Sequence, residues 1–137
     1  MKLQRVVYKE LSAKQKEVYN FQRLASVLAL YGFNCIKLDD DWQGADFLAY
    51  HKDGTQTLRV QLKGRLTIAQ KYLQKHLYMA FPASDRWYLA PHDDLVTIID
   101  EETTWLTSLS WVEDGHYSRA RPPRRLMDRL TEYALDD

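Results

Sequence analysis

The first thirty residues carry the hydrophobic period of an amphipathic helix. Over residues 11–31 apolar side chains recur at helical spacing. Ser12 stands where an N-cap is expected, and Gly32 follows the last apolar residue. The apolar residues that fall within roughly 40° of one line, at ~100° per residue, are Phe21, Leu24, Leu28 and Tyr31. Glu17 lies on the same line, so the helix should place a carboxylate at the N-terminal end of its buried stripe.

The pattern then changes to the period of two that is typical of β-strands. Short apolar runs predict strands at residues 33–38, 47–50, 58–62, 77–81 and 86–90. An acidic stretch, "DDDWQG", follows the first of these and is expected to be a solvated loop, with a metal-ligand role as the alternative. Between the second and third strands, "KDGT" indicates a hairpin, because Asp-Gly supplies the positive φ angles of a tight primed turn.

Helical patterns also occur later in the chain. Such helices are expected at residues 67–74, 91–100 and 122–135. Asp93 or Asp94 should cap the second of them. Residues 103–118 show no clear period. The element order α-β-β-β-α-β-β-α therefore predicts a mixed α+β sheet with helices packed on it.

The hairpin also predicts which side chains face one another. If the Asp-Gly pair forms a two-residue loop, antiparallel partners have residue numbers that sum to 107, and Asp46 lies opposite Gln61. Lys63 is two residues beyond Gln61 and shares its face, whereas a register slip of one residue would separate these groups. We expect the helix at residues 11–31 to pack on this face and to bring Glu17 to the cluster.

Composition narrows the class of protein. A chain of 137 residues is one domain, residues 1–137. It has no apolar run of the ~20 residues that a membrane span needs, and its start lacks a secretory signal, so a cytoplasmic location is expected. The lone Cys35 excludes an intramolecular disulfide and a Cys-rich zinc site. The net charge of zero argues against a protein that coats nucleic acid, but it allows a basic patch beside an acidic site.

The polar cluster has the residue types of a site that hydrolyses phosphodiesters. "AD" at residues 45–46 and "QLK" at residues 61–63 resemble the motif of the PD-(D/E)xK nuclease superfamily. That motif has an aspartate at the start of one strand, then an acidic residue and a lysine that flank one residue on the next strand. Glu17 on the preceding helix is similar to the family's usual layout. This sequence departs from the pattern at Ala45, which replaces a proline, and at Gln61, which replaces the acidic residue.

The resemblance implies a restriction endonuclease-like three-layer core and a metal-dependent DNA endonuclease. Its catalytic residues would be Glu17, Asp46, Gln61 and Lys63. Asp46, Gln61 and Glu17, together with the carbonyl of Leu62, would hold Mg²⁺ or Mn²⁺, because such ions prefer oxygen ligands. Lys63 would orient the attacking water and stabilise the developing negative charge. Such domains commonly dimerise to reach both strands, so a homodimer is the expected assembly.

Basic residues outside the motif are candidates for contacts with DNA phosphates, which suit guanidinium and ammonium groups. They are Arg65, Lys71, Arg119, Arg121, Arg124 and Arg125. Two other functions stay open. A neutral Gln61 would weaken a metal site, so the same fold would serve as a nucleic-acid or protein-binding module. Alternatively, the cluster is the charged edge of a sheet in an unrelated α+β interaction protein.

Overall fold

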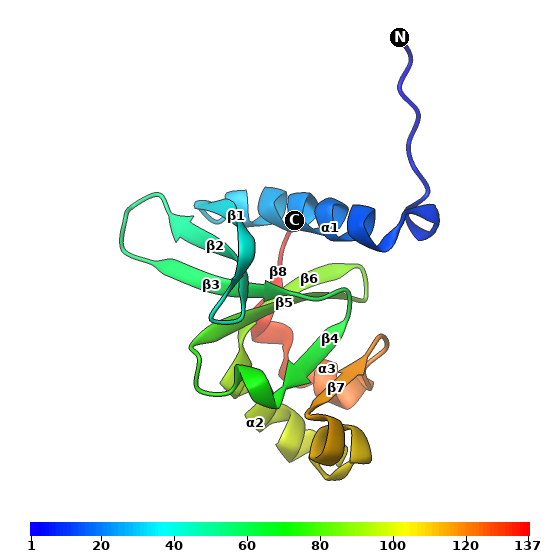
Figure 1. Ribbon diagram of the computed structural model, residues 1–137, viewed down its shortest axis with the longest axis vertical. Coiled ribbons are helices and arrows are strands. Elements are labelled where there is room, and N and C mark those ends of the chain that lie inside the picture. Colours follow the sequence, from blue (N-terminus) through cyan, green and yellow to red (C-terminus); the bar gives the residue numbers. More distant parts are fainter.

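The computed structural model describes residues 1–137 and is built on a six-stranded mixed sheet (Figure 1). The strand order is β1-β2-β3-β5-β6-β8. The strands are β1 (Phe33–Trp42), β2 (Ala45–His51), β3 (Thr57–Leu62), β5 (Leu77–Ala83), β6 (Arg86–Pro91) and β8 (Ala134–Leu135). Only the β3–β5 pair is parallel. The prediction of a mixed α+β sheet is confirmed.

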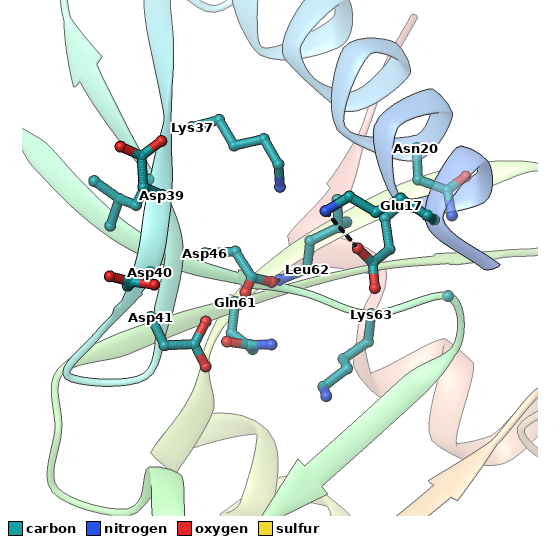
Figure 2. A pocket seen from close by; sticks show the side chains of 13 residues that line it. Glu17, Asn20, Lys37, Asp39, Asp40, Asp41, Asp46, Gln61, Leu62 and Lys63 are labelled. Carbon is teal, nitrogen blue, oxygen red and sulfur yellow. Dashed lines mark hydrogen bonds and ion pairs between the residues drawn. The ribbon is translucent and has the colours of Figure 1, made fainter.

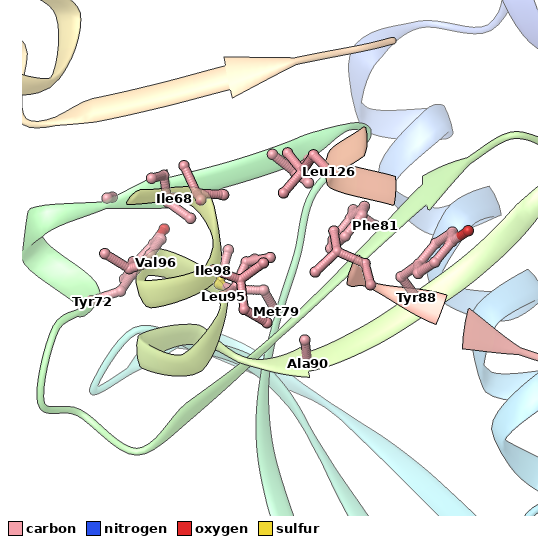
Figure 3. Close-up of a cluster of buried hydrophobic side chains, with 14 of the residues drawn as sticks. Ile68, Tyr72, Met79, Phe81, Tyr88, Ala90, Leu95, Val96, Ile98 and Leu126 are labelled. Atoms are coloured by element: carbon pink, nitrogen blue, oxygen red, sulfur yellow. The ribbon is translucent and has the colours of Figure 1, made fainter. Parts of the chain in front are cut away.

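Helices cover both faces of this sheet, so the molecule has the three layers that the resemblance implies (Figure 1). Helix α1 (Ala13–Ala29) lies on one face. Helices α2 (His92–Glu102) and α3 (Arg124–Arg129) lie on the other, with the two-stranded ribbon of β4 (Leu66–Ala69) and β7 (His116–Arg119). Their apolar side chains converge on Met79 and Phe81 of β5 (Figure 3). None of the helices has the length and apolarity that crossing a bilayer requires.

Helix α1 begins at the predicted cap. The Ser12 hydroxyl accepts from the Gln15 N–H at 3.2 Å, and the Gln15 side chain accepts from the Ser12 N–H at 2.9 Å, which is a capping box. The helix buries Leu24 and Leu28 against the sheet. Tyr31, expected on the same stripe, is 41% exposed because it lies beyond the end of the helix.

The order of elements differs from the prediction at three places. Residues 67–74 form β4 and a 3₁₀ turn (Gln70–Tyr72) instead of a helix, because Leu66 and Ile68 alternate into the core as β4 pairs with β7. The predicted helix at residues 122–135 is only the six-residue α3, followed by a 3₁₀ turn (Thr131–Tyr133) and β8, which pairs with β6. The acidic stretch after residue 38 belongs to β1 rather than to a loop.

Two further details could not be read from local patterns. The N-cap of α2 is Pro91 and has no side-chain cap; Asp93 instead accepts from the Gln74 N–H at 2.9 Å. Residues 103–118, which show no clear period, fold as a 3₁₀ turn (Trp105–Thr107), a π-helical turn (Ser110–Asp114) and β7.

Candidate active site

The β2–β3 hairpin has the predicted register. Its paired residues have numbers that sum to 107, as in Phe47↔Val60 and Tyr50↔Thr57. The turn is different in detail. Gly54 alone has a positive φ, of 77°, and the Asp53 carboxylate accepts from the Thr55 N–H at 2.9 Å. An Asx-type turn therefore produces the register that a two-residue primed turn would have produced.

Asp46 lies where β2 and β3 begin to separate. The last ladder pair is Phe47↔Val60, and beyond it the Leu62 N–H donates to Oδ2 of Asp46 at 2.9 Å. The Lys63 N–H turns the other way and donates to the carbonyl of Ala80 on β5 at 2.9 Å. At Leu62 the Asp46 carboxylate thus takes the place of a backbone carbonyl as the hydrogen-bond acceptor for β3. The separated ends of β2 and β3 border a cavity.

This cavity has a volume of about 420 Å³ and a predominantly polar lining (Figure 2). The predicted catalytic residues all line it: Glu17, Asp46, Gln61 and Lys63. Leu62, the predicted backbone ligand, lines it as well. The structure adds residues that the sequence interpretation did not assign to the site: Lys14, Asn20, Lys37, Leu38 and Gly64, with Asp39–Asp41, for which a ligand role was only the alternative.

Glu17 reaches the cavity by a different route from the expected one. Helix α1 packs on the opposite face of the hairpin, against Phe47 and Val60, because that face is the apolar one. Glu17 stands near the start of the helix, and its side chain lines the cavity. Its side chain is 65% exposed and lies 3.6 Å from the Lys14 ammonium. It therefore borders the cavity rather than forming its floor.

Gln61 is the buried polar residue at the bottom of the site. Its side chain is 5% exposed, and its Oε1 is the one buried side-chain nitrogen or oxygen atom without a hydrogen-bond partner. Figure 2 shows the amide in the same cavity as the side chains of Asp41 and Lys63. Leaving a buried acceptor unpaired costs about 1–3 kcal/mol. This acceptor has no hydrogen-bond partner within the protein.

The surroundings of Asp46 disfavour its ionised form. Burial raises the pKa of its carboxyl, and the nearby Asp41 carboxylate raises the pKa further, whereas the Leu62 N–H and the Lys37 ammonium act in the opposite direction. Burial, assisted by Asp46 and Asp41, also raises the pKa of Tyr72 to about 12. A bound cation would stabilise the ionised carboxylates.

The donor atoms fit a hard divalent cation. The lining of the cavity offers carboxylate oxygens of Asp46 and Asp41, the unpaired Oε1 of Gln61 and the backbone of Leu62. No three His, Cys, Asp or Glu side chains are grouped so as to hold a metal by themselves. Mg²⁺ accepts such a set, because it binds through one or two carboxylates and keeps several waters. A soft ion would require sulfur or imidazole ligands, which do not line this cavity.

Lys63 places a positively charged ammonium group at this site. Its ammonium has no carboxylate partner within 4.0 Å and lies 5.9 Å from the ring centroid of Tyr72. Lys37 approaches Asp46 from β1, and its ammonium lies 5.4 Å from the ring centroid of Phe21. Lys37 pairs with Phe47 in the ladder and lies on the face that α1 covers. The alternation of side chains along β1 could have predicted this position from the sequence.

The predicted phosphate-binding residues differ in their surroundings. Arg65, Arg121 and Arg124 are exposed, and the ammonium of Lys71 lies 5.3 Å from the ring centroid of Tyr72. Arg125 donates to Glu102 at 2.6 Å, so part of its guanidinium is already paired. Arg119 stacks on aromatic rings.

Comparisons with known proteins gave matches only among solved structures. No family model matches the sequence, and no curated protein matches it significantly. The chain is similar to Hjc, a Holliday junction resolvase from Archaeoglobus fulgidus, with 16% identity over 57% of this chain and 74% of that one and a TM-score of 0.46. It is also similar to the bacterial homing endonuclease I-Ssp6803I, with 14% identity over 90% and 86% and a TM-score of 0.49. At these identities the likeness concerns the path of the backbone alone.

Proposed function

We propose that this protein is a metal-dependent DNA endonuclease that hydrolyses phosphodiester bonds. The observation that carries the proposal is the buried, unpartnered Oε1 of Gln61 beside the carboxylate of Asp46. Lys63, two residues further along the chain and just beyond the end of β3, adds an ammonium without a carboxylate partner. The cavity thus combines oxygen ligands for a metal ion with an ammonium group that has no carboxylate partner. Phosphodiester hydrolysis uses this combination.

Each residue of the site has a distinct role in this proposal. Asp46, oriented by the Leu62 N–H, and Gln61 would hold Mg²⁺ or Mn²⁺ with the Leu62 carbonyl, and Glu17 would contribute through water. When bound, the ion would neutralise charge on the phosphate and acidify a water molecule. The Lys63 ammonium would hold the attacking water and stabilise negative charge as it develops on the phosphate oxygens.

The substrate is proposed to be DNA held by basic residues outside the lining of the cavity. Those proposed to contact its phosphates are Arg65, Lys71, Arg119, Arg121, Arg124 and Arg125. Because one cavity acts on one strand, a homodimer would provide the second site for cutting both strands.

A cleavage assay tests the proposal directly. Supercoiled, linear and branched DNA would be incubated with Mg²⁺, with Mn²⁺ or with EDTA. We expect metal-dependent nicking or cleavage that falls at least about 100-fold in Asp46→Asn and Lys63→Met, the scale of losing one preorganised charged group. Lys52→Met, at the exposed tip of the hairpin, is the control and should keep full activity. Cleavage that survives both substitutions in the cavity would show that the activity has another source.

A second candidate function is a binding module without catalysis. The neutral Gln61 favours it, because an amide in place of a carboxylate would weaken the binding of a metal ion. DNA binding without cleavage of any substrate, together with no effect of Mg²⁺ on thermal unfolding, would support this function over the nuclease.

A further inference from the structure

Arg119 at the end of β7 has a guanidinium that is already fixed in position. Its Cζ lies 4.9 Å from the ring centroid of Trp105 and 5.8 Å from that of Tyr117. The same guanidinium donates to the Tyr117 hydroxyl at 2.7 Å. The two rings stack with centroids 4.5 Å apart and an interplanar angle of 19°, and Trp105 is 6% exposed. The aromatic support therefore belongs to the hydrophobic core, and little side-chain entropy remains for Arg119 to lose on binding a ligand.

The charge of Arg119 is not compensated. No carboxylate lies within 4.0 Å of it, whereas Arg86 pairs with Asp136, and both Arg125 and Arg129 pair with Glu102. Arg119 is nevertheless exposed, so the N–H groups that Tyr117 does not use face solvent. A planar, oriented guanidinium with free donors matches the geometry of a phosphate group.

The position of Arg119 links it to the candidate active site. Arg119 is the ladder partner of Leu66, the first residue of β4. Only Gly64 and the exposed Arg65 separate Leu66 from Lys63 of the cavity. The edge of the ribbon is therefore continuous with the rim of the cavity.

We propose that Arg119, held by Trp105 and Tyr117, binds a backbone phosphate of double-stranded DNA outside the phosphodiester that enters the cavity. This inference rests on the proposed function, because it places both phosphates on one DNA molecule. The aromatic support favours a duplex over a single strand. Proteins that bind single strands stack unpaired bases on aromatic faces. Here the rings of Trp105 and Tyr117 face each other and Arg119, and Trp105 is almost fully buried. The contact that remains is to the backbone, and it carries no sequence preference.

The test measures binding of a short labelled duplex in EDTA, so that neither metal nor cleavage contributes. Arg119→Gln should weaken binding about tenfold, the scale of a charge-assisted hydrogen bond. It should also lower the slope of log affinity against log salt by about 0.9, the change expected for one lost phosphate contact. Arg119→Lys keeps the charge but loses the fork and the stacking, so most of the loss should remain.

Arg23→Gln is the matched control, because it removes the same charge from an exposed arginine of α1 that has no aromatic support and is not among the proposed phosphate contacts. It should weaken binding less than about threefold, as expected for an isolated surface contact. If Arg119→Gln perturbs the near-ultraviolet spectrum of the folded protein, Tyr117→Phe takes its place. That change removes only the hydroxyl that accepts from the guanidinium, and it should weaken binding by a few-fold.

Several outcomes would overturn the assignment: a wild-type protein that does not bind the duplex, equal losses in Arg119→Gln and Arg23→Gln, or wild-type affinity in Arg119→Lys. A larger loss on single-stranded DNA of the same length would overturn the choice of a duplex. The proposed function fails separately. Binding that depends on Arg119 without any cleavage would refute the nuclease alone, and metal-dependent cleavage with Arg119-independent binding would refute this inference alone.

Discussion

The backbone N–H of Leu62 donates to Oδ2 of Asp46 at 2.9 Å, across the point where β2 and β3 part. This hydrogen bond fixes the carboxylate relative to Gln61 and Lys63, which flank Leu62 at the end of β3. The relative position of the three side chains is thus set by backbone, which moves less than long side chains do.

Replacing Gln61 with leucine should stabilise the protein in the absence of metal. The substitution keeps the side chain close to its original size and removes a buried acceptor that has no partner, so we expect the free energy of unfolding to rise by about 1–2 kcal/mol in EDTA. Urea titration in EDTA measures this change. Mg²⁺ should raise the melting temperature of the wild type and leave that of Gln61→Leu unchanged. A wild-type melting temperature that does not respond to Mg²⁺ or Mn²⁺ would argue against a metal at Gln61.

Asp41 should contribute to the affinity of the site for metal, although the sequence pattern favours a solvated role for it. Its carboxylate raises the pKa of Asp46, so the two groups share one electrostatic environment. Asp41→Asn should weaken Mn²⁺ binding about tenfold in a calorimetric titration, which is the scale of losing one supporting carboxylate. Asp39→Asn, two residues away on the same strand, serves as the control and should change affinity much less. Equal effects of the two substitutions would indicate that Asp41 acts on the metal ion only through long-range electrostatics and does not bind it.

Gly44→Ala should destabilise the fold near the active site. Gly44 has a φ of 87°, and an added Cβ would lie 2.7 Å from Leu77 Cδ1 and 3.3 Å from Tyr72 Cδ1. The positive φ alone costs about 1–2 kcal/mol for alanine, and the overlap in a packed core adds roughly 1–3 kcal/mol.

Gly54→Ala is the control for that measurement. Gly54 has a φ of 77° but nothing within 4 Å of the added carbon, so it should show only the backbone cost. The difference between the two variants in chemical denaturation isolates the packing at Gly44. If the two losses are equal, Leu77 and Tyr72 adjust freely.

Stability should fall in mild acid because of His92. Its side chain is fully buried, and burial lowers the pKa of the imidazole, although Asp93 at 3.0 Å raises it. The unfolded chain therefore takes up a proton near pH 6.5, the ordinary pKa of histidine, while the folded protein does not. The free energy of unfolding should decrease as the pH falls through that value towards the lowered pKa. Urea titrations at several pH values should show a shallower decrease in His92→Gln, and the exposed His76→Gln should follow the wild type.

Local patterns predicted the parts of the structure that depend on neighbours along the chain. The cap at Ser12 and the start of α1 depend on a few adjacent residues. The hairpin register depends on the alternation within two strands and on a turn that joins them. Since side chains alternate with a period of two, this register alone was sufficient to place Asp46 opposite Gln61.

Long-range contacts decided the rest. Residues 67–74 became β4 and a turn because β7 pairs with them, and the end of the predicted C-terminal helix became β8 because β6 has a free edge. In both cases the pairing strand lies far away in the sequence, so a local pattern could not predict the pairing. The π-helical and 3₁₀ turns between residues 103 and 114 follow no simple period, so the support of Arg119 by Trp105 was not visible in the sequence.

The sequence by itself determined the residue types of the site and the order in which two strands present them. Tertiary structure decided how the site is closed. It placed α1 on the apolar face of the hairpin, so that Glu17 borders the cavity from the first turns of the helix. It brought Asp41 towards Asp46 and buried Oε1 of Gln61 without a partner. Burial depends on which distant segments cover a residue, and that is settled only when the whole chain packs.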